Sequence, residues 1–308
     1  MWGAFLAFLV ALLLFDLLVL HREAHVVSFR EAAIASAGWI AIGVGFTFVV
    51  GWWLGGVAAT QYITAYVIEK SLSVDNVFVW AVIFTSFAVP AIYQHRVLFW
   101  GIFGALVMRA IFIFAGVALL ERLEWLLFVF GGFLVFTAYR VFREPTGEVH
   151  PEQNRVLRFV KRFVPVTTRY DGQHFFTKEN AKRVATPLFV VLVLIEATDL
   201  VFAVDSVPAV LAISRDPFVV FTSNALAILG LRSLYFVLAG ARDRLVYLHR
   251  GLGVILFYVG VKMIISPWYH INSLISLAFI AIVLTITVIA SLRAPRMILP
   301  KHPEQPGG

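Results

Sequence analysis

Long apolar blocks recur along the chain and are separated by short polar segments. Blocks such as Trp39–Leu54 and Leu274–Leu292 approach the roughly 20 apolar residues that a helix needs to cross a bilayer. The first block, Trp2–Leu20, has no positive n-region and is longer than a signal-peptide core of about 7–15 residues, so it too is interpreted as a span. The pattern predicts an all-α, polytopic transmembrane bundle that forms a single membrane domain over residues 1–308. The nine predicted spans are residues 2–20, 32–54, 57–89, 98–119, 124–142, 185–212, 217–239, 245–266 and 272–292.

Basic residues gather on one side of this predicted bundle. The loops after spans one, three, five and seven and the C-terminal tail together hold 19 lysines and arginines. The other side holds Arg122 and Arg215, and Lys262 if the eighth span ends before it. Because positive loops stay in the cytoplasm, we expect an inner (plasma) membrane protein with its N-terminus outside and its C-terminus in the cytoplasm.

Composition narrows the chemistry that is available. Hydrophobic residues make up 61% of the chain and charged residues 14%, far from the roughly 45–50% and 25% of soluble domains. Cysteine is absent, which excludes disulfides, thiolate metal sites and cysteine catalysis. The net charge of +7 sits in loops, so a nucleic-acid partner is not expected. The basic loop at 143–184 is either a solvated linker or a segment that lies on anionic lipid or binds a protein partner.

Two stretches of the chain share a pattern. Glu69–Val77 and Asp199–Val207 both read acid-x4-Val-Asp-[Asn/Ser]-Val, and similar residues precede Arg109 and Arg232 in the spans that follow. Each repeated unit has three spans, so the second unit enters the membrane from the opposite side. This arrangement is an inverted repeat, which is typical of secondary transporters. The two predicted units cover about 57–142 and 185–267, and the final span at 272–292 follows them.

Acidic residues fall inside the predicted spans. Each costs roughly 2.5–3.5 kcal/mol at a helix centre, so such residues usually face a bundle interior and mark an ion or proton path. The five acids are Glu69, Asp75, Glu196, Asp199 and Asp205. Lys70, Arg109 and Arg232 cannot neutralise them one for one, so the surplus must be protonated, hydrated or bound to a cation. Asp16, by contrast, is expected at a hydrated helix end.

The spacing of the acids bears on the helices that carry them. On a straight helix Asp75 lies about 120° from Glu69, and Asp205 lies nearly opposite Glu196. A local break would let these side chains meet, and Pro208 leaves a carbonyl without its helical donor one residue before Asp205. The sequence therefore predicts either discontinuous helices in spans three and six or a simple tilt or proline kink.

The polar groups in these segments are hard oxygen donors. Carboxylates, an amide and hydroxyls favour Mn²⁺, Ca²⁺ or Mg²⁺ over Zn²⁺ or Cu⁺. No prosthetic group is expected, and the metal ion is interpreted as a substrate. The predicted metal ligands are Glu69, Asp75, Asn76, Glu196, Asp199, Asp205 and Ser206, and the predicted charge-balancing residues are Lys70, Arg109 and Arg232.

The stretches Glu-Lys-Ser-Leu-Ser-Val-Asp-Asn at 69–76 and Glu-Ala-Thr-Asp-Leu-Val-Phe-Ala-Val-Asp-Ser-Val-Pro at 196–208 resemble the signature segments of the TerC/Alx family. The resemblance runs from about span two to span nine. It implies a membrane protein tied to manganese export, with the acids of both segments as ligands. Some relatives are named for tellurite resistance, and others are associated with metal supply to exported enzymes. Every one of the five acids matches.

The function predicted from these observations is non-enzymatic efflux of a divalent metal ion, Mn²⁺ before other hard cations, by alternating access and with proton antiport as the coupling. One alternative is a membrane partner or sensor that binds metal without transporting it and recruits proteins through the loop at 143–184. A more remote alternative is an intramembrane aspartyl protease with Asp75 and Asp205 as its dyad. The extra acids and the absence of a Gly-x-Gly-Asp motif argue against a protease.

Overall fold

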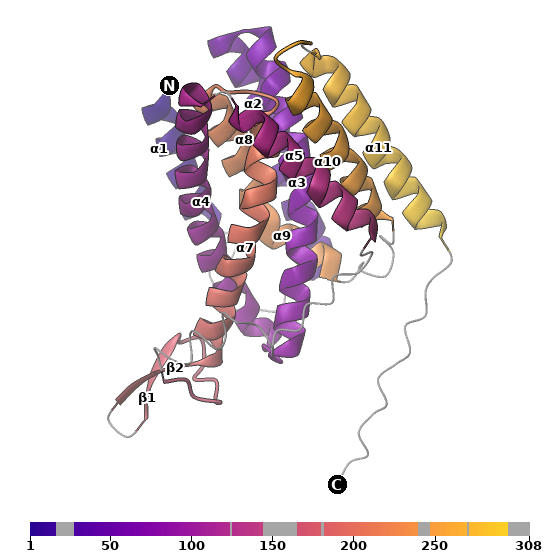
Figure 1. The fold of residues 1–308 in the computed structure, drawn as a ribbon. Coiled ribbons are helices and arrows are strands. Elements are labelled where there is room, and N and C mark those ends of the chain that lie inside the picture. The colour runs from indigo at the N-terminus through magenta and orange to yellow at the C-terminus, as the bar shows by residue number, and fades with distance from the viewer. Residues whose placement is uncertain are drawn as a thin grey trace.

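Helices make up nearly all the regular structure in the computed structural model of this protein, as Figure 1 shows. The structure describes residues 1–16, 28–123, 125–143, 165–179, 182–239, 247–269 and 271–294. Within these ranges only the backbone is described for Asp75, Ser86, Lys182, Ala239, Leu248, His249 and Ser273. The helices are α1 (Trp2–Phe15), α2 (Phe29–Leu54), α3 (Gly56–Ser86), α4 (Ala91–Arg122), α5 (Leu126–Arg143), α7 (Pro187–Leu211), α8 (Pro217–Leu229), α9 (Leu231–Ala239), α10 (Leu248–Ile265) and α11 (Ser273–Arg293).

The all-α class and the membrane location agree with the predictions. Among the described residues five helices, α2, α4, α5, α7 and α11, are long and apolar enough to cross a bilayer, and α8 with α9 makes a sixth if the bent pair is one span. Helix α3 has the length but carries charged and polar residues along its middle, which lowers its hydropathy. Every predicted span overlaps at least one described helix, and the span 217–239 overlaps two, α8 and α9. The count of nine spans and the inverted repeat stay predictions.

The break in the bundle lies elsewhere than expected. Helices α3 and α7 are both continuous, and α7 runs through Pro208. The predicted discontinuity in spans three and six is therefore wrong. Pro208 removes one backbone hydrogen bond, but it lies close to the C-terminal end of α7. The loss therefore affects only the last turn of the helix. A bend of 43° instead separates α8 from α9 at Gly230, where a Cβ atom would lie 2.7 Å from Cβ of Trp39.

Helices of the two predicted repeat units pack against one another. Helix α3 packs against α8, α4 against α7, and α5 against α10, while α11 lies beside α10 at the edge of the bundle (Figure 1). These pairs connect segments that are far apart in the sequence, so the middle of the bundle is built jointly from both units.

Glycines allow a close approach between α5 and α10. A Cβ atom added to Gly131 would lie 2.8 Å from the carbonyl oxygen of Gly260, and one added to Gly260 would lie 2.8 Å from the carbonyl oxygen of Gly131. Small residues let transmembrane backbones approach in this way, and dispersion contacts then hold the helices together. The neighbouring Gly132 has no heavy atom within 4 Å of the same ideal position.

We expect Gly131→Ala to destabilise the protein by about 1–3 kcal/mol, because the added methyl group meets the backbone of Gly260 as well as the side chain of Ile264. The measurement is thermal unfolding of the purified protein in detergent. Gly132→Ala is the matched control and should unfold at or slightly above the wild-type temperature. Equal unfolding temperatures for the two variants would contradict the close packing of α5 on α10.

A small hairpin precedes α7 within the basic loop, and the all-α prediction missed it. Strand β1 (Phe176–Glu179) pairs antiparallel with β2 (Lys182–Ala185), and Figure 1 shows the hairpin beyond the end of the bundle where α7 begins. The guanidinium carbon of Arg183 lies 5.3 Å from the centre of the Phe176 ring. The Tyr170 hydroxyl donates to the Phe87 carbonyl at 2.6 Å, and burial raises the pKa of this hydroxyl. The described part of the loop is therefore attached to the bundle.

Candidate functional site

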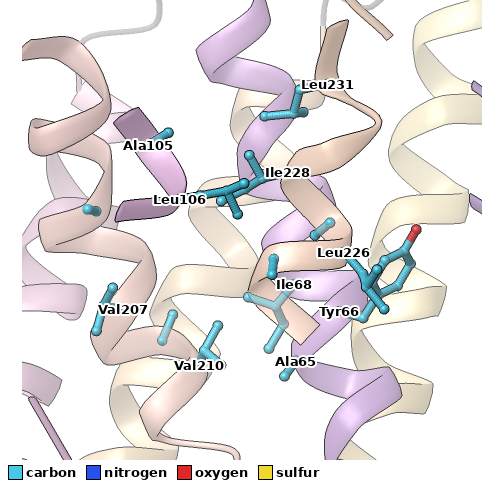
Figure 2. Close-up of a cluster of buried hydrophobic side chains, with 14 of the residues drawn as sticks. Ala65, Tyr66, Ile68, Ala105, Leu106, Val207, Val210, Leu226, Ile228 and Leu231 are labelled. Atoms are coloured by element: carbon cyan, nitrogen blue, oxygen red, sulfur yellow. The ribbon is translucent and has the colours of Figure 1, made fainter. Parts of the chain in front are cut away.

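Apolar side chains from four helices enclose the centre of the bundle. Figure 2 shows Ile68 of α3, Leu106 of α4, Val207 of α7 and Leu226 of α8 within one buried cluster. Several charged and polar residues are direct sequence neighbours of these apolar ones. Because the surroundings are apolar, each buried polar group needs a partner within the protein, in place of water or lipid.

Arg109 of α4 is the centre of a buried polar cluster. Its Nε and Nη2 donate to the two carboxylate oxygens of Asp199 on α7, at 3.3 and 3.0 Å. Its Nη1 donates to Ser206 Oγ at 3.1 Å and forms an ion pair with Glu69 of α3. One guanidinium thereby joins three helices, and it binds Asp199 in the two-pronged geometry that suits arginine and carboxylate groups.

Amides and a hydroxyl complete the cluster. Asn76 Nδ2 donates to Asp199 Oδ1 at 3.2 Å, and Asn224 Nδ2 of α8 donates to Glu69 Oε2 at 2.9 Å. Ser73 Oγ donates to Glu69 Oε1 at 3.4 Å. Both carboxylates and every one of their partners are at most 2% exposed. We refer below to Glu69, Ser73, Asn76, Arg109, Asp199, Ser206 and Asn224 as the central cluster.

The central cluster has two features that suit a bound cation. Glu69 and Asp199 bring two negative charges, and Arg109 supplies the one positive charge that pairs with them among the described side chains. The cluster is therefore left with one negative charge. In addition, Asn76 Oδ1 is buried and has no hydrogen-bond partner among the described residues, which leaves a hard oxygen donor beside the carboxylates.

Some predicted ligands lie apart from the central cluster. Asp205 of α7 accepts a hydrogen bond from Thr137 Oγ1 of α5 at 3.0 Å and is half-buried. Glu196 is also half-buried, and its carboxylate occupies the space beside Gly104 of α4, where a Cβ atom would collide with it. The side chain of Asp75 lies outside the described part of the structure. The separation of Asp205 from Asp199 follows from the straight helix, since six residues turn it well away from its neighbour.

The predicted charge-balancing residues act differently from one another. Arg109 pairs with two of the acids, as expected. Lys70 Nζ donates to the Ala227 carbonyl at 3.0 Å, close to the bend between α8 and α9. In an unbroken helix that carbonyl would accept from the amide of Leu231, so Lys70 supplies a donor where the bend removes one.

Arg232, at the start of α9, forms an ion pair with Asp16 at the end of α1 and also donates to the Asp16 backbone carbonyl at 3.2 Å. The prediction that Asp16 lies at a hydrated helix end is wrong, because the residue is only 5% exposed. The burial of Asp16 could not be predicted from the sequence, because its partner is far away in the chain and because acids near helix ends are ordinarily solvated.

The sequence-based prediction did not include two residues that donate hydrogen bonds to these acids, Asn224 and Thr137. The run Thr222–Ser223–Asn224 inside an otherwise apolar span was an available signal, because polar residues in membrane helices are commonly bonded across helices. Thr137 carries no such signal, since a lone threonine is common in membrane helices and can satisfy its hydroxyl on its own backbone.

As it stands, the central cluster is an arginine-held carboxylate pair, and no group of three or more His, Cys, Asp or Glu side chains within the described ranges has metal-binding geometry. Its chemistry is that of hard-oxygen cation binding, with two carboxylates, a free amide oxygen and serine hydroxyls. No His, Cys or Met belongs to it. The complete set of predicted metal ligands stays a prediction.

Comparison with known proteins agrees with the membrane fold. A family model described as the integral membrane protein TerC family matches residues 54–297. An uncharacterized membrane protein of Myxococcus xanthus is 50% identical over 292 residues, which cover 95% of this chain and 92% of that protein. Proteins named putative membrane-bound redox modulator Alx are 42% identical in Salmonella typhi, over 94% of this chain and 92% of theirs, and 39% identical in Escherichia coli K12, over 100% and 98%. No solved structure matches the chain.

Proposed function

Because the chain belongs to the TerC family of integral membrane proteins, we propose that it exports a divalent metal ion, Mn²⁺ in the first place, across the plasma membrane. The observation that carries this proposal is the surplus negative charge of the central cluster. Two fully buried carboxylates, Glu69 and Asp199, share the single guanidinium of Arg109 near the middle of long membrane helices. Such charges are costly in a membrane and usually mark the path of an ion.

The donor set supports a hard cation as the substrate. Carboxylate, amide and hydroxyl oxygens suit Mn²⁺, Ca²⁺ and Mg²⁺, which bind oxygen ligands, more than Zn²⁺ or Cu⁺. Glu69 and Asp199 would supply the anionic oxygens, and Asn76 would supply its unpaired amide oxygen. In this proposal Glu196 and Asp205 take part as further carboxylates along the path rather than as members of one closed site, and Asp75 stays a predicted ligand.

The way the helices pack supports alternating access as the proposed mechanism. The cluster lies where α3 and α8 of different predicted repeat units meet α4 and α7, so a relative movement of the two units would open it first to one side and then to the other. We propose that the N-terminus lies outside and the C-terminus in the cytoplasm, since 19 lysines and arginines fall on the C-terminal side of the membrane. Protons are the proposed counter-ions, because crowded carboxylates can take up protons as the metal leaves.

The Alx relatives are named as redox modulators. Thiol–disulfide exchange is not available to this chain, which has no cysteine. A second candidate function is that of a membrane partner that binds metal without transporting it. The exposed Lys178 and Arg183 of the β1–β2 hairpin favour such a role, because they offer a basic surface outside the bundle.

The test is the manganese content of cells under manganese stress, with and without the protein. Cells that produce the wild type should hold less manganese than cells with an empty vector, and Glu69→Gln should raise the content to the vector level. Glu121→Gln, an exposed position at the end of α4, is the matched control and should behave as wild type. Wild-type cells that retain as much manganese as vector cells, at equal protein levels in the membrane, would contradict export and favour the non-transporting partner.

A further inference from the structure

Arg109 holds the same oxygens that a metal ion would need. Its guanidinium binds both oxygens of Asp199, pairs with Glu69 and donates to Ser206. A divalent cation that used both carboxylates would have to share their lone pairs with three N–H···O contacts from Arg109. The central cluster therefore already contains a cation, supplied by the protein itself.

Electrostatics make joint occupancy unfavourable. With Arg109 in place the paired groups Glu69, Asp199 and Arg109 carry a net charge of −1, and a divalent ion would bring this to +1 in apolar surroundings. If the guanidinium moves away, two carboxylates and one divalent ion sum to zero. Like charges a few ångströms apart repel strongly where water is excluded. Metal binding and the present position of Arg109 should therefore exclude each other.

We propose that Arg109 is a resident counter-cation, which occupies the metal site in the empty protein and is displaced when a divalent ion binds. This inference rests on the proposed function. Asn76 points independently to a ligand at the same place, because its buried Oδ1 faces no donor among the described residues although its Nδ2 binds Asp199. A buried oxygen without a hydrogen-bond partner beside two carboxylates is available as a ligand to a cation.

The displaced guanidinium has an acceptor on the same helix interface. Glu196 precedes Asp199 by three residues on α7, and its carboxylate lies against Gly104, five residues before Arg109 on α4. Glu196 forms no hydrogen bond or ion pair with another described side chain. Helical side chains lean toward the N-terminus, so Arg109 leans toward Gly104. Arg109 can thus exchange one carboxylate partner for another without a charge being left unpaired in the membrane.

The experiment is equilibrium binding of Mn²⁺ to the purified full-length protein in lipid nanodiscs. Arg109→Gln should bind Mn²⁺ at least about tenfold more tightly than wild type, because the competing charge is gone. Arg109→Lys keeps the charge but has fewer donors for the two carboxylates, and should fall between the two. Arg143→Gln, at an exposed basic position at the end of α5 and outside the central cluster, is the matched control and should bind as wild type. Variants of Arg109 that bind Mn²⁺ equally or more weakly than wild type would overturn the proposal.

A second measurement covers the case in which Arg109→Gln does not fold, since that variant leaves two buried carboxylates without their cation. Arg109→Lys then decides the question alone, by its affinity relative to wild type. If every variant and the wild type fail to bind Mn²⁺, the proposed function fails along with this inference. If all bind but the affinity does not depend on Arg109, only this inference fails.

Discussion

Replacing Asp199 by asparagine is expected to reduce manganese transport at least about tenfold, since even groups that merely support a metal ligand commonly change affinity by this much. The substitution removes one carboxylate charge and keeps the side-chain volume. It leaves Glu69 and Arg109 as a balanced pair, so the central cluster loses its surplus negative charge without gaining an unpaired one. The protein should therefore reach the membrane in normal amount and yet fail to carry the ion. The measurement is the initial rate of radioactive Mn²⁺ uptake by inside-out membrane vesicles, divided by the amount of protein.

The control for this prediction is Asp171→Asn, the same chemical change at an exposed position of the loop before α7. It should transport at the wild-type rate. Glu69→Gln offers an independent check. It removes the charge of the other carboxylate, which makes the central cluster neutral, and it should lose transport in the same way. Wild-type uptake by both Asp199→Asn and Glu69→Gln would mean that the surplus charge has no part in transport.

Breaking the Asp16–Arg232 ion pair is expected to cost about 3–5 kcal/mol of stability, the usual effect of leaving one buried charge without its partner. The pair ties the end of α1 to the start of α9, directly after the bend at Gly230. Arg232 is 1% exposed, so water cannot take the place of the lost carboxylate. Asp16→Asn should lower the unfolding temperature of the purified protein in detergent far more than a surface substitution does.

The double variant Asp16→Leu with Arg232→Leu distinguishes the electrostatic contribution of the ion pair from the contribution of the volume that the two side chains fill. Replacing both members of a buried pair by apolar residues is often close to neutral, so the double variant should recover a large part of the stability that Asp16→Asn loses. Arg215→Gln, at an exposed position before α8, should unfold as wild type. An Asp16→Asn protein that is as stable as Arg215→Gln would show that α1 is not held to α9 by this pair.

Apolar periodicity alone was enough to locate the helices, because burial in lipid demands long unbroken apolar runs. The meeting of Glu69 and Asp199 could also be anticipated, since matching positions in two repeated segments indicated a shared location. The carboxylate surplus over basic residues then made Arg109 an obvious partner. These inferences depend on composition and local order, which a sequence displays directly.

Other features depend on contacts that the sequence does not display. Asp16 pairs with Arg232, which lies 216 positions later in the chain, and no local pattern connects the two. The bend lies at Gly230 rather than near Pro208, because tight packing against Trp39 and a carbonyl bonded by Lys70 make a break tolerable there. Asp205 and Asp199 lie on one continuous helix and face different neighbours, so a shared motif did not guarantee a shared site.

The most direct test of the account is Mn²⁺ flux by the purified wild-type protein in liposomes that contain a dye quenched by Mn²⁺. We expect saturable quenching that is much faster than in protein-free liposomes and that Asp199→Asn slows to near the protein-free rate. Wild-type liposomes that quench no faster than protein-free ones, with the protein verified as inserted and folded, would contradict the claim that the buried carboxylates of α3 and α7 form a path for a divalent cation.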